Sequence, residues 1–379
     1  MVPQANDISI KLGNNFCNYV PNSGDITDCM LGLFDQANRR SLTVHQMSIN
    51  IGLVDSAIRL SALEIDWFEN DGIVERIIRN NAGTLESLSI YMNKKTVSRI
   101  WKIVGCDDQI VYPQLQTVNI QAEDVSECYS LESNIDPKHV PFPKLRHLTV
   151  DSNYSYTAET FLRGSVKTVE YLDVQLTANI LGILTELYSN CDQPAVRQVL
   201  LRIPNYTQYL SNGVYNDASY CTMMTKFLDA LPRDLLGLRL RESTLNNICI
   251  LDSVMKKFTK LHILQADGAK MRISQVCKLA SLVPSLRHLY ISDIKVDELF
   301  HKTEIRDIVT RLSKEYQVAD SNLRYVELLG EVDSSYNIND MLTEVANCSS
   351  ILMVLCPRFN QIKFEEYWQK AVYEPTSDL

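Results

Sequence analysis

The stretch VPFPKLRHLTVDSN, from Val140 to Asn153, carries its apolar residues in a spacing that decides the fold. Leu145, Leu148 and Val150 form the pattern L-x-x-L-x-L, and Asn153 follows shortly afterwards. The end of the pattern alternates between apolar and polar residues, as in a β-strand that buries one face. The same spacing continues outwards from this stretch along nearly the whole chain.

Triplets with this spacing recur at fairly regular intervals. They are Val44/Met47/Ile49, Leu60/Leu63/Ile65, Leu85/Leu88/Ile90, Leu115/Val118/Ile120, Leu145/Leu148/Val150, Val169/Leu172/Val174, Val196/Val199/Leu201, Leu235/Leu238/Leu240, Leu261/Leu264/Ala266, Leu286/Leu289/Ile291, Leu323/Val326/Leu328 and, as a weaker match, Ile351/Val354/Cys356. Most intervals are close to the roughly 20 to 29 residues of one leucine-rich repeat. The first interval is too short for a full helix, and the one between Val196 and Leu235 is stretched.

A helical period replaces the strand period between the triplets. Apolar residues at i, i+3, i+4 and i+7 occur over 97–104, 224–231, 276–283 and 305–312, which predicts helices with one apolar stripe. Strands and helices that alternate in this way give parallel strands with right-handed crossovers. We therefore expect an α/β leucine-rich-repeat solenoid, a horseshoe with a parallel concave sheet, convex helices and about 12 irregular repeats. An ordinary doubly wound α/β domain is the alternative.

The domain organisation follows from where the repeats lie. Residues 1–40 are predicted to form an N-terminal cap or an irregular first repeat, with a strand over 8–12. Residues 41–358 form the repeat array, and 359–379 form a C-terminal cap or tail. The Asn that follows a regular repeat is present only at Asn93 and Asn153. We therefore expect an irregular array whose turns are stabilised in different ways.

Composition and charge limit the class of partner. The chain has 379 residues and a net charge of −9, which argues against a nucleic-acid backbone as the main partner, because such binding needs a concentrated basic surface. No apolar run approaches the roughly 18 residues of a membrane span. The N-terminal sequence MVPQANDISI does not resemble a signal peptide.

Ten cysteines are present without a CxxC motif, and Cys221, Cys249 and Cys277 are regularly spaced. That spacing favours reduced thiols at equivalent core positions, with disulfides as the alternative. Together with the missing signal peptide, it predicts a cytoplasmic protein, with the nucleus as the alternative.

Several repeats also carry a family resemblance. TLESLSI (Thr84 to Ile90), YPQLQTVNI (Tyr112 to Ile120), VPFPKLRHLTV, and FLRGSVKTVEYLDVQL (Phe161 to Leu176) together resemble a group of fungal leucine-rich-repeat proteins often described as F-box-like. The resemblance implies a horseshoe fold and a protein-binding role, and it implies no catalytic residue. Many members carry an F-box-type segment ahead of the repeats, and no such segment is visible here.

The patterns GxxxxGK(S/T), GxGxxG, HExxH, GxSxG and the EF-hand loop do not occur in the sequence. Ser253 and Lys256 fit S-x-x-K, but the motifs that accompany it in known enzymes are missing. His147 and His288 both occur in L-R-H-L, in repeats too far apart to share a metal. We therefore expect no catalytic residue, no cofactor and no metal.

The remaining candidate is the concave face, where the residues between the leucines point outwards. Acidic residues give way to arginines along it, and arginine grips carboxylates and phosphates in a fork. A loop over 204–220 adds tyrosines and small polar residues, a mixture that suits recognition. The candidate contact residues are Tyr171, Asp173, Arg202, Tyr206, Tyr209, Tyr215, Arg239 and Arg241. The alternatives are a solvated polar face and a poorly ordered insertion.

Three functions remain in view. The leading hypothesis is a non-enzymatic scaffold that binds another protein on its concave face. The second is the substrate-recognition subunit of an SCF-type ubiquitin ligase, which would also bind a Skp-type adaptor. The third is an enzyme hidden in an unusual repeat protein, which would need a deep pocket of ionisable groups.

Overall fold

The structure is a computed structural model of the whole chain. It describes residues 7–12, 39–45, 59–66, 71–92, 104, 110–122, 141–151, 155–176, 178–202, 217–241, 254, 256–266, 283, 285–294, 325–330 and 352–355. The chain divides into two compact units, Met1–Ala195 and Val196–Leu379. Each unit is described by itself.

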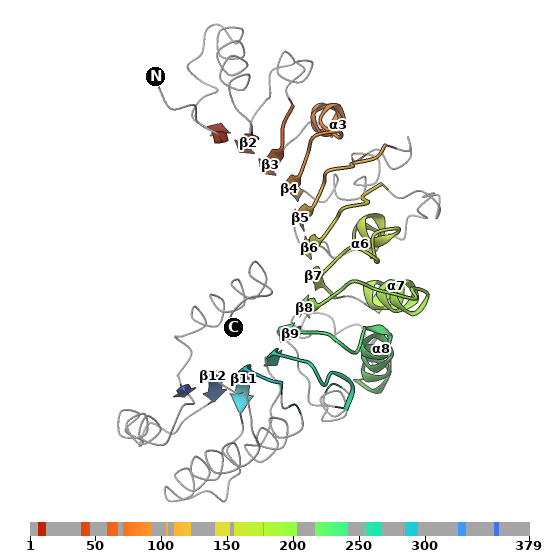
Figure 1. Cartoon of the computed structure of the whole chain (residues 1–379), viewed down its shortest axis with the longest axis vertical. Coiled ribbons are helices and arrows are strands. Elements are labelled where there is room, and N and C mark those ends of the chain that lie inside the picture. The colour runs from red at the N-terminus through yellow and green to blue at the C-terminus, as the bar shows by residue number, and fades with distance from the viewer. Residues whose placement is uncertain are drawn as a thin grey trace, which may run out of the picture. The chain divides into compact units, whose positions relative to one another are not determined.

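The first unit is a parallel sheet whose strands pair in chain order. Its strands are β1 (Asp7–Leu12), β2 (Arg39–His45), β3 (Ala62–Asp66), β4 (Ser87–Met92), β5 (Thr117–Ala122), β6 (His147–Asp151) and β7 (Tyr171–Gln175). Its described helices are α3 (Asp71–Asn80), α6 (Ser155–Leu162) and α7 (Ala178–Ser189). The three helices lie on the same side of the strands, and α6 packs on both β6 and α7 (Figure 1).

The second unit repeats this arrangement. Its parallel strands also pair in chain order, and one described helix follows the first of them. The elements are β8 (Gln198–Arg202), α8 (Asp217–Ala230), β9 (Gly237–Arg241), β10 (Ile263–Ala266), β11 (His288–Ile294), β12 (Tyr325–Gly330) and β13 (Leu352–Leu355). In Figure 1, α8 lies beside β8 and β9 on one side of the strands. The predicted α/β class and parallel strands are confirmed.

The leucine core forms where the triplets predict it. Leu145, Leu148 and Val150 are completely or almost completely buried. The parallel register places Leu148 between Val118 and Leu172, so equivalent triplet residues stack from strand to strand. The other triplets of β3 to β10 are buried in the same way. Burial of one such side chain stabilises the fold by about 1.5–3 kcal/mol, and the repetition makes this face the core of each unit.

The helices add their apolar stripes to the core. Met224, Phe227 and Leu228 of α8 and the following Leu231 are all buried, as their spacing predicts. Val74, Ile77 and Ile78 do the same on α3. The other predicted stripes, over 97–104, 276–283 and 305–312, lie mostly or wholly outside the described residues. The predicted boundaries at residues 40 and 358 are not tested, and they stay a prediction.

The first predicted triplet, Val44/Met47/Ile49, is wrong in register. The strand runs over Arg39–His45, and Leu42 and Val44 pair with Leu63 and Ile65 of the next repeat. Arginine occupies the position that an apolar residue fills in the other triplets, so the spacing alone favoured a later match. The first triplet therefore begins at Arg39 instead of Val44, which lengthens the interval to the second triplet at Leu60.

The last predicted triplet, Ile351/Val354/Cys356, is wrong by one residue. Met353 and Leu355 pair with Val326 and Leu328, whereas Val354 pairs with Glu327. A shift of one residue moves every side chain to the other face of a strand. The segment LMVL is apolar at every position, so its sequence contains no alternation that could set the register.

A repeated backbone interaction fixes how neighbouring repeats stack. In each case one carbonyl, just after the first triplet position, accepts hydrogen bonds from two consecutive N–H groups of the next repeat. The acceptors are Ser61, Glu86, Gln116 and Arg146 in the first unit, and Arg197, Leu236 and His262 in the second. The N···O distances lie between 2.7 and 3.1 Å, within the normal range. Both units therefore use the same repeat geometry.

Side chains reinforce this stacking at individual turns. Leu60 N–H donates to Asn81 Oδ1 at 2.9 Å, and Asn81 Nδ2 donates to the Ile77 carbonyl at 2.8 Å. The Thr84 hydroxyl donates to the Leu60 carbonyl at 2.8 Å, and Ser285 does the same to Leu261 at 2.9 Å in the second unit. The turns are thus stabilised in more than one way, whereas Asn93 and Asn153 lie outside the described residues.

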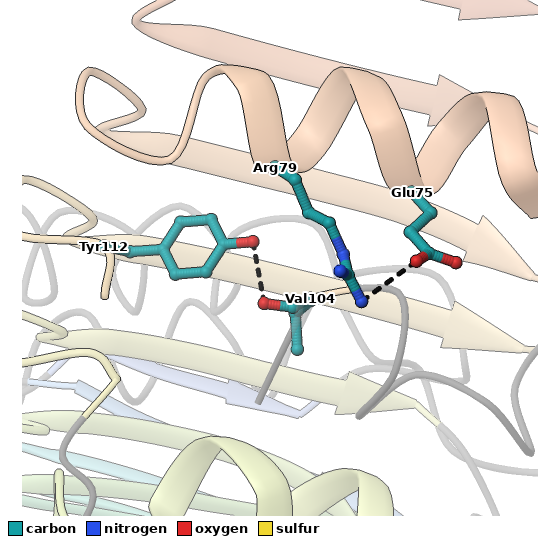
Figure 2. A network of polar contacts seen from close by, with 4 residues as sticks. All are labelled: Glu75, Arg79, Val104 and Tyr112. Carbon is teal, nitrogen blue, oxygen red and sulfur yellow. Dashed lines mark hydrogen bonds and ion pairs between the residues drawn. The ribbon is translucent and has the colours of Figure 1, made fainter. Parts of the chain in front are cut away.

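Aromatic side chains form a second line of contacts through the first unit. Tyr112 and Phe142 each stand three positions before the first leucine of a triplet, and their ring centroids lie 5.4 Å apart. Phe142 and Phe161 lie 5.0 Å apart. Figure 2 shows the Tyr112 hydroxyl donating to the Val104 carbonyl, at 2.9 Å, near the Glu75–Arg79 ion pair of α3. The phenol can be buried because its hydroxyl has this partner.

Replacing Asn81 tests the side-chain part of the stacking. In Asn81→Ala, the Leu60 N–H loses its side-chain acceptor in a buried position, so the free energy of unfolding should fall by about 1–3 kcal/mol. Gly83→Ala is the matched control, because a Cβ there meets nothing within 4 Å, and it should change stability by less than about 0.5 kcal/mol. Urea denaturation measures both variants. Equal, small effects for the two would contradict this role of Asn81.

Candidate protein-binding surface

We define the outer face of each unit as the side of its strands opposite the leucine core. On the first unit it consists of polar side chains in three rows, because strand residues alternate between the two faces. The rows are Ser87, Thr117, His147 and Tyr171; then Ser89, Asn119, Thr149 and Asp173; and then Tyr91, Gln121 and Asp151. The first-unit outer face therefore contains no leucine on β4 to β7.

Most of the first-unit outer face reaches the surface. Gln121 is exposed, and the others are half-buried except Asp173, whose exposed fraction is 5%. Tyr171 lies edge-on to the His147 ring, with centroids 6.1 Å apart. Asn119 Nδ2 on β5 donates to Ser89 Oγ on the neighbouring β4 at 3.3 Å. This face thus presents hydroxyl, amide, carboxylate and aromatic groups side by side.

The second-unit outer face has a different character. Its central row runs Leu200, Arg239, Gln265, Tyr290 across β8 to β11, and a flanking row runs Gln198, Gly237, Ile263, His288. Arg239, Gln265 and Tyr290 are each 1% exposed. Arg239 Nε donates to Gln265 Oε1 at 2.5 Å, so the buried guanidinium is held by its neighbour on the next strand. Both rows of this face are therefore buried.

The predicted contact residues do not all belong to the same unit. Tyr171 and Asp173 belong to the first unit, and Arg202, Arg239 and Arg241 belong to the second. Arg202 pairs in register with Arg241, and Leu200 pairs with Arg239. The Arg241 side chain is not among those described, and Tyr206, Tyr209 and Tyr215 lie outside the described residues.

Sequence reasoning placed Arg239 on the correct face of its strand but missed its burial. It placed Gln265 on the same face but did not predict its contact with Arg239, although both occupy the same position in neighbouring triplets. Alignment of successive triplets in the sequence could have found the pair, because residues at equal positions of neighbouring strands stand about 4.8 Å apart. The burial had no such signal, since residues at equal positions of the first unit are mostly half-buried whereas Arg239 is buried.

Two histidines at the start of strands, His147 in β6 and His262 just before β10, have lowered pKa values. Burial lowers the pKa of His147, the nearby Glu170 carboxylate opposes this effect, and Arg146 adds to it. Burial also lowers the pKa of His262, and Arg287 acts in the same direction. Both imidazoles are therefore more easily kept neutral in the folded chain than in the unfolded one.

In the part of the chain that the structure describes, no three or more His, Cys, Asp or Glu side chains gather in a way that could hold a metal ion. None of the helices described above has both the length and the apolar composition needed to cross a membrane.

No family model matches the chain, and a search of curated proteins finds no similar sequence. Among solved structures, a chain from the crystal structure of the Rad7 and Elc1 complex in yeast is similar, with a TM-score of 0.50 and 14% identity. The match covers 88% of this chain and 78% of that chain. Together with the buried triplets, this similarity gives a leucine-rich-repeat-like α/β fold. Membership in the fungal group stays a prediction.

The histidines give the fold a defined pH dependence. Because their folded-state pKa values lie below the unfolded value of 6.5, the unfolded chain binds more protons near that pH. The free energy of unfolding should therefore fall as the pH drops below about 6.5. His147→Gln and His262→Gln together should reduce this fall, measured by urea denaturation between about pH 7.5 and 5.5. An unchanged pH dependence in the double variant would contradict the assignment.

Proposed function

We propose that this chain is a non-enzymatic scaffold that binds another protein through its first-unit outer face. The proposal includes the horseshoe form with about 12 repeats, with the outer face as its concave side. It also keeps the expected location in the cytoplasm or nucleus, which derives from the sequence. Neither a nucleic acid nor a membrane is part of the proposal.

One observation supports this function above the others. The first-unit outer face presents polar and aromatic side chains on adjacent strands, and these are exposed or half-buried apart from Asp173. The leucine core lies on the opposite side of the strands. Tyr91 and Tyr171 offer rigid aromatic surface with a polar tip, a combination enriched at protein interfaces. Gln121 and Asp151 stand next to each other in register and provide hydrogen-bonding groups. Side chains held by a rigid sheet lose little freedom on binding.

The proposed contact surface differs in part from the one that the sequence predicts. Tyr171 and Asp173 remain within it, and Asp173 contributes mainly as a supporting residue because it is almost buried. Arg239 is unsuited to direct contact in this conformation, since its side chain is buried against Gln265. Arg202 and Arg241 stay candidates at the end of β8 and β9.

Charge substitution on the face tests the proposal. Gln121→Arg together with Asp151→Arg places two cations where the face presents an amide and a carboxylate. The affinity of a captured partner should fall at least about tenfold, or about 1.4 kcal/mol. The measurement is affinity capture of the full chain from its native cell with quantitative mass spectrometry, followed by titration of the recovered partner.

The matched control is Glu186→Arg. Glu186 is exposed on α7 of the same unit, so this change alters the net charge in the same direction without touching the outer face. The control should retain the partner. Full retention by the Gln121/Asp151 variant, with unchanged thermal unfolding, would overturn the proposed surface.

A second candidate function is substrate recognition within an SCF-type ubiquitin ligase, with a Skp-type adaptor as an additional partner. It draws support from one fact, that the similar solved chain comes from a complex of two proteins, Rad7 and Elc1. In the same capture experiment, this function predicts that a Skp-type adaptor is recovered with the wild type and with the Gln121/Asp151 variant alike. Its absence from both would count against the ligase role and leave the scaffold role intact.

A further inference from the structure

The turns that lead into the strands of the second unit carry a group of cations. Arg197, Arg233, Lys256 and Lys260 are exposed, and Arg287 is half-buried. Each lies just before one of the strands β8 to β11. Because these strands are parallel and pair in chain order, their first residues meet at the same edge of the sheet. We call these five residues the basic edge.

Backbone hydrogen bonds hold the turns of the basic edge side by side. The Arg197 carbonyl accepts the Leu236 N–H at 2.7 Å, and the Leu236 carbonyl accepts the His262 N–H at 2.7 Å. The His262 carbonyl in turn accepts the Arg287 N–H at 2.8 Å. Arg197 and Arg287 are thus three strand spacings apart, or about 14 Å. The basic edge is therefore a compact group of cations.

A further lysine, Lys257, ties the turn before β10 to the end of α8. Its Nζ donates to the Leu228 carbonyl at 2.6 Å and to the Asp229 carbonyl, where the last carbonyls of a helix favour a cation. Burial lowers the pKa of Lys257, the Asp229 carboxylate opposes this effect, and Arg233 adds to it. Arg233 therefore lies near this contact, and the turns before β9 and β10 are held together by side chains as well as by the backbone.

The cations of the basic edge are not neutralised by neighbouring carboxylates. Within the described part of the chain, no residue of the basic edge forms an ion pair. Three arginines of the first unit, by contrast, are paired: Arg79 with Glu75, Arg146 with Glu170, and Arg163 with Glu159. Cations held close together without such partners create a positive potential that attracts an anionic ligand.

Carboxylates of a protein segment suit the basic edge better than a nucleic-acid backbone does. Asp234 directly follows Arg233, Asp229 lies near Lys257, and both acids are exposed. A nucleic acid carries a charge at every nucleotide, so it would meet these two acids and a chain of net charge −9. A peptide can place neutral residues opposite the acids, and the guanidinium group binds carboxylates in a fork.

The spacing of an extended peptide also matches the basic edge. Alternate residues of a strand point to the same side and stand about 6.6 Å apart. Three acidic residues at i, i+2 and i+4 therefore span about 13 Å, which is close to the separation of Arg197 and Arg287.

We propose that the basic edge binds an extended acidic segment of another protein, whose alternate Asp or Glu side chains pair with the arginines and lysines of the edge. This site lies on the second unit, so it is distinct from the first-unit outer face and does not depend on the function proposed there. The chain then has two contact surfaces of different chemistry, one with polar and aromatic side chains and one with cations.

A defined peptide tests this site on the full chain. The probe is a fluorescein-labelled ten-residue peptide of alternating Glu and Ser, and the comparison peptide has Gln at each Glu position. In fluorescence anisotropy the Glu peptide should bind at least about tenfold more tightly, and its affinity should fall as salt rises, because exposed ion pairs are screened. Equal binding of the two peptides, or no binding of the Glu peptide up to about 1 mM, would overturn the proposal.

Substitutions locate the binding. Arg197→Gln together with Lys260→Gln should weaken binding of the Glu peptide by about fivefold or more, because two exposed ion pairs are lost. The matched control is Lys167→Gln together with Lys226→Gln, which changes the net charge equally on a first-unit turn and on α8, and it should bind as the wild type does. All four residues are exposed, so both variants should unfold at the wild-type temperature.

Two outcomes of these titrations contradict the site. One is wild-type affinity for the Glu peptide in the Arg197/Lys260 variant, or an equal loss in the control. The other is tighter binding of a labelled single strand of ten thymidines than of the Glu peptide at the same salt concentration, which would assign the basic edge to nucleic acid.

Discussion

The stacking of this protein depends on one backbone interaction, in which a carbonyl just after the first triplet position of a repeat accepts hydrogen bonds from two N–H groups of the next repeat. It recurs from Ser61 to Arg146 in the first unit and from Arg197 to His262 in the second. It holds each strand at one level relative to its neighbour, so equivalent leucines meet in the core and equivalent polar residues meet on the outer face. Both the core and the candidate surface follow from this alignment.

The two units use the same alignment for different purposes. On the first unit, the rows around Asn119 and Gln121 remain partly exposed, which suits recognition of another protein. On the second, a buried Arg239 is held by Gln265. Burial of a cation is tolerated only where its hydrogen-bonding groups have partners. The outer face is therefore mostly half-buried on the first unit and buried on β8 to β11 of the second.

Much of the fold could be predicted from the sequence, because the leucine triplets record both the strand and its buried face. The prediction failed at the two ends for physical reasons: Arg39 replaces an apolar residue in the first repeat, and the apolar run over 352–355 has no alternation. The contact surface was less predictable. Alternation places Arg239 on the outer face, but it does not tell whether a side chain there is half-buried, as most are on the first unit, or buried, as Arg239 is.

Native-state hydrogen exchange tests the repeated stacking most directly, because it reports on individual backbone amides. The amides that donate to the shared carbonyls, such as those of Ser87, Thr117 and His147 in the first unit and Gly237 and Ile263 in the second, lie at the start of strands. We predict that they exchange only through large openings, with protection close to that of the central strand amides. Exchange of these amides as fast as that of exposed turns would contradict the repeat geometry on which both faces depend.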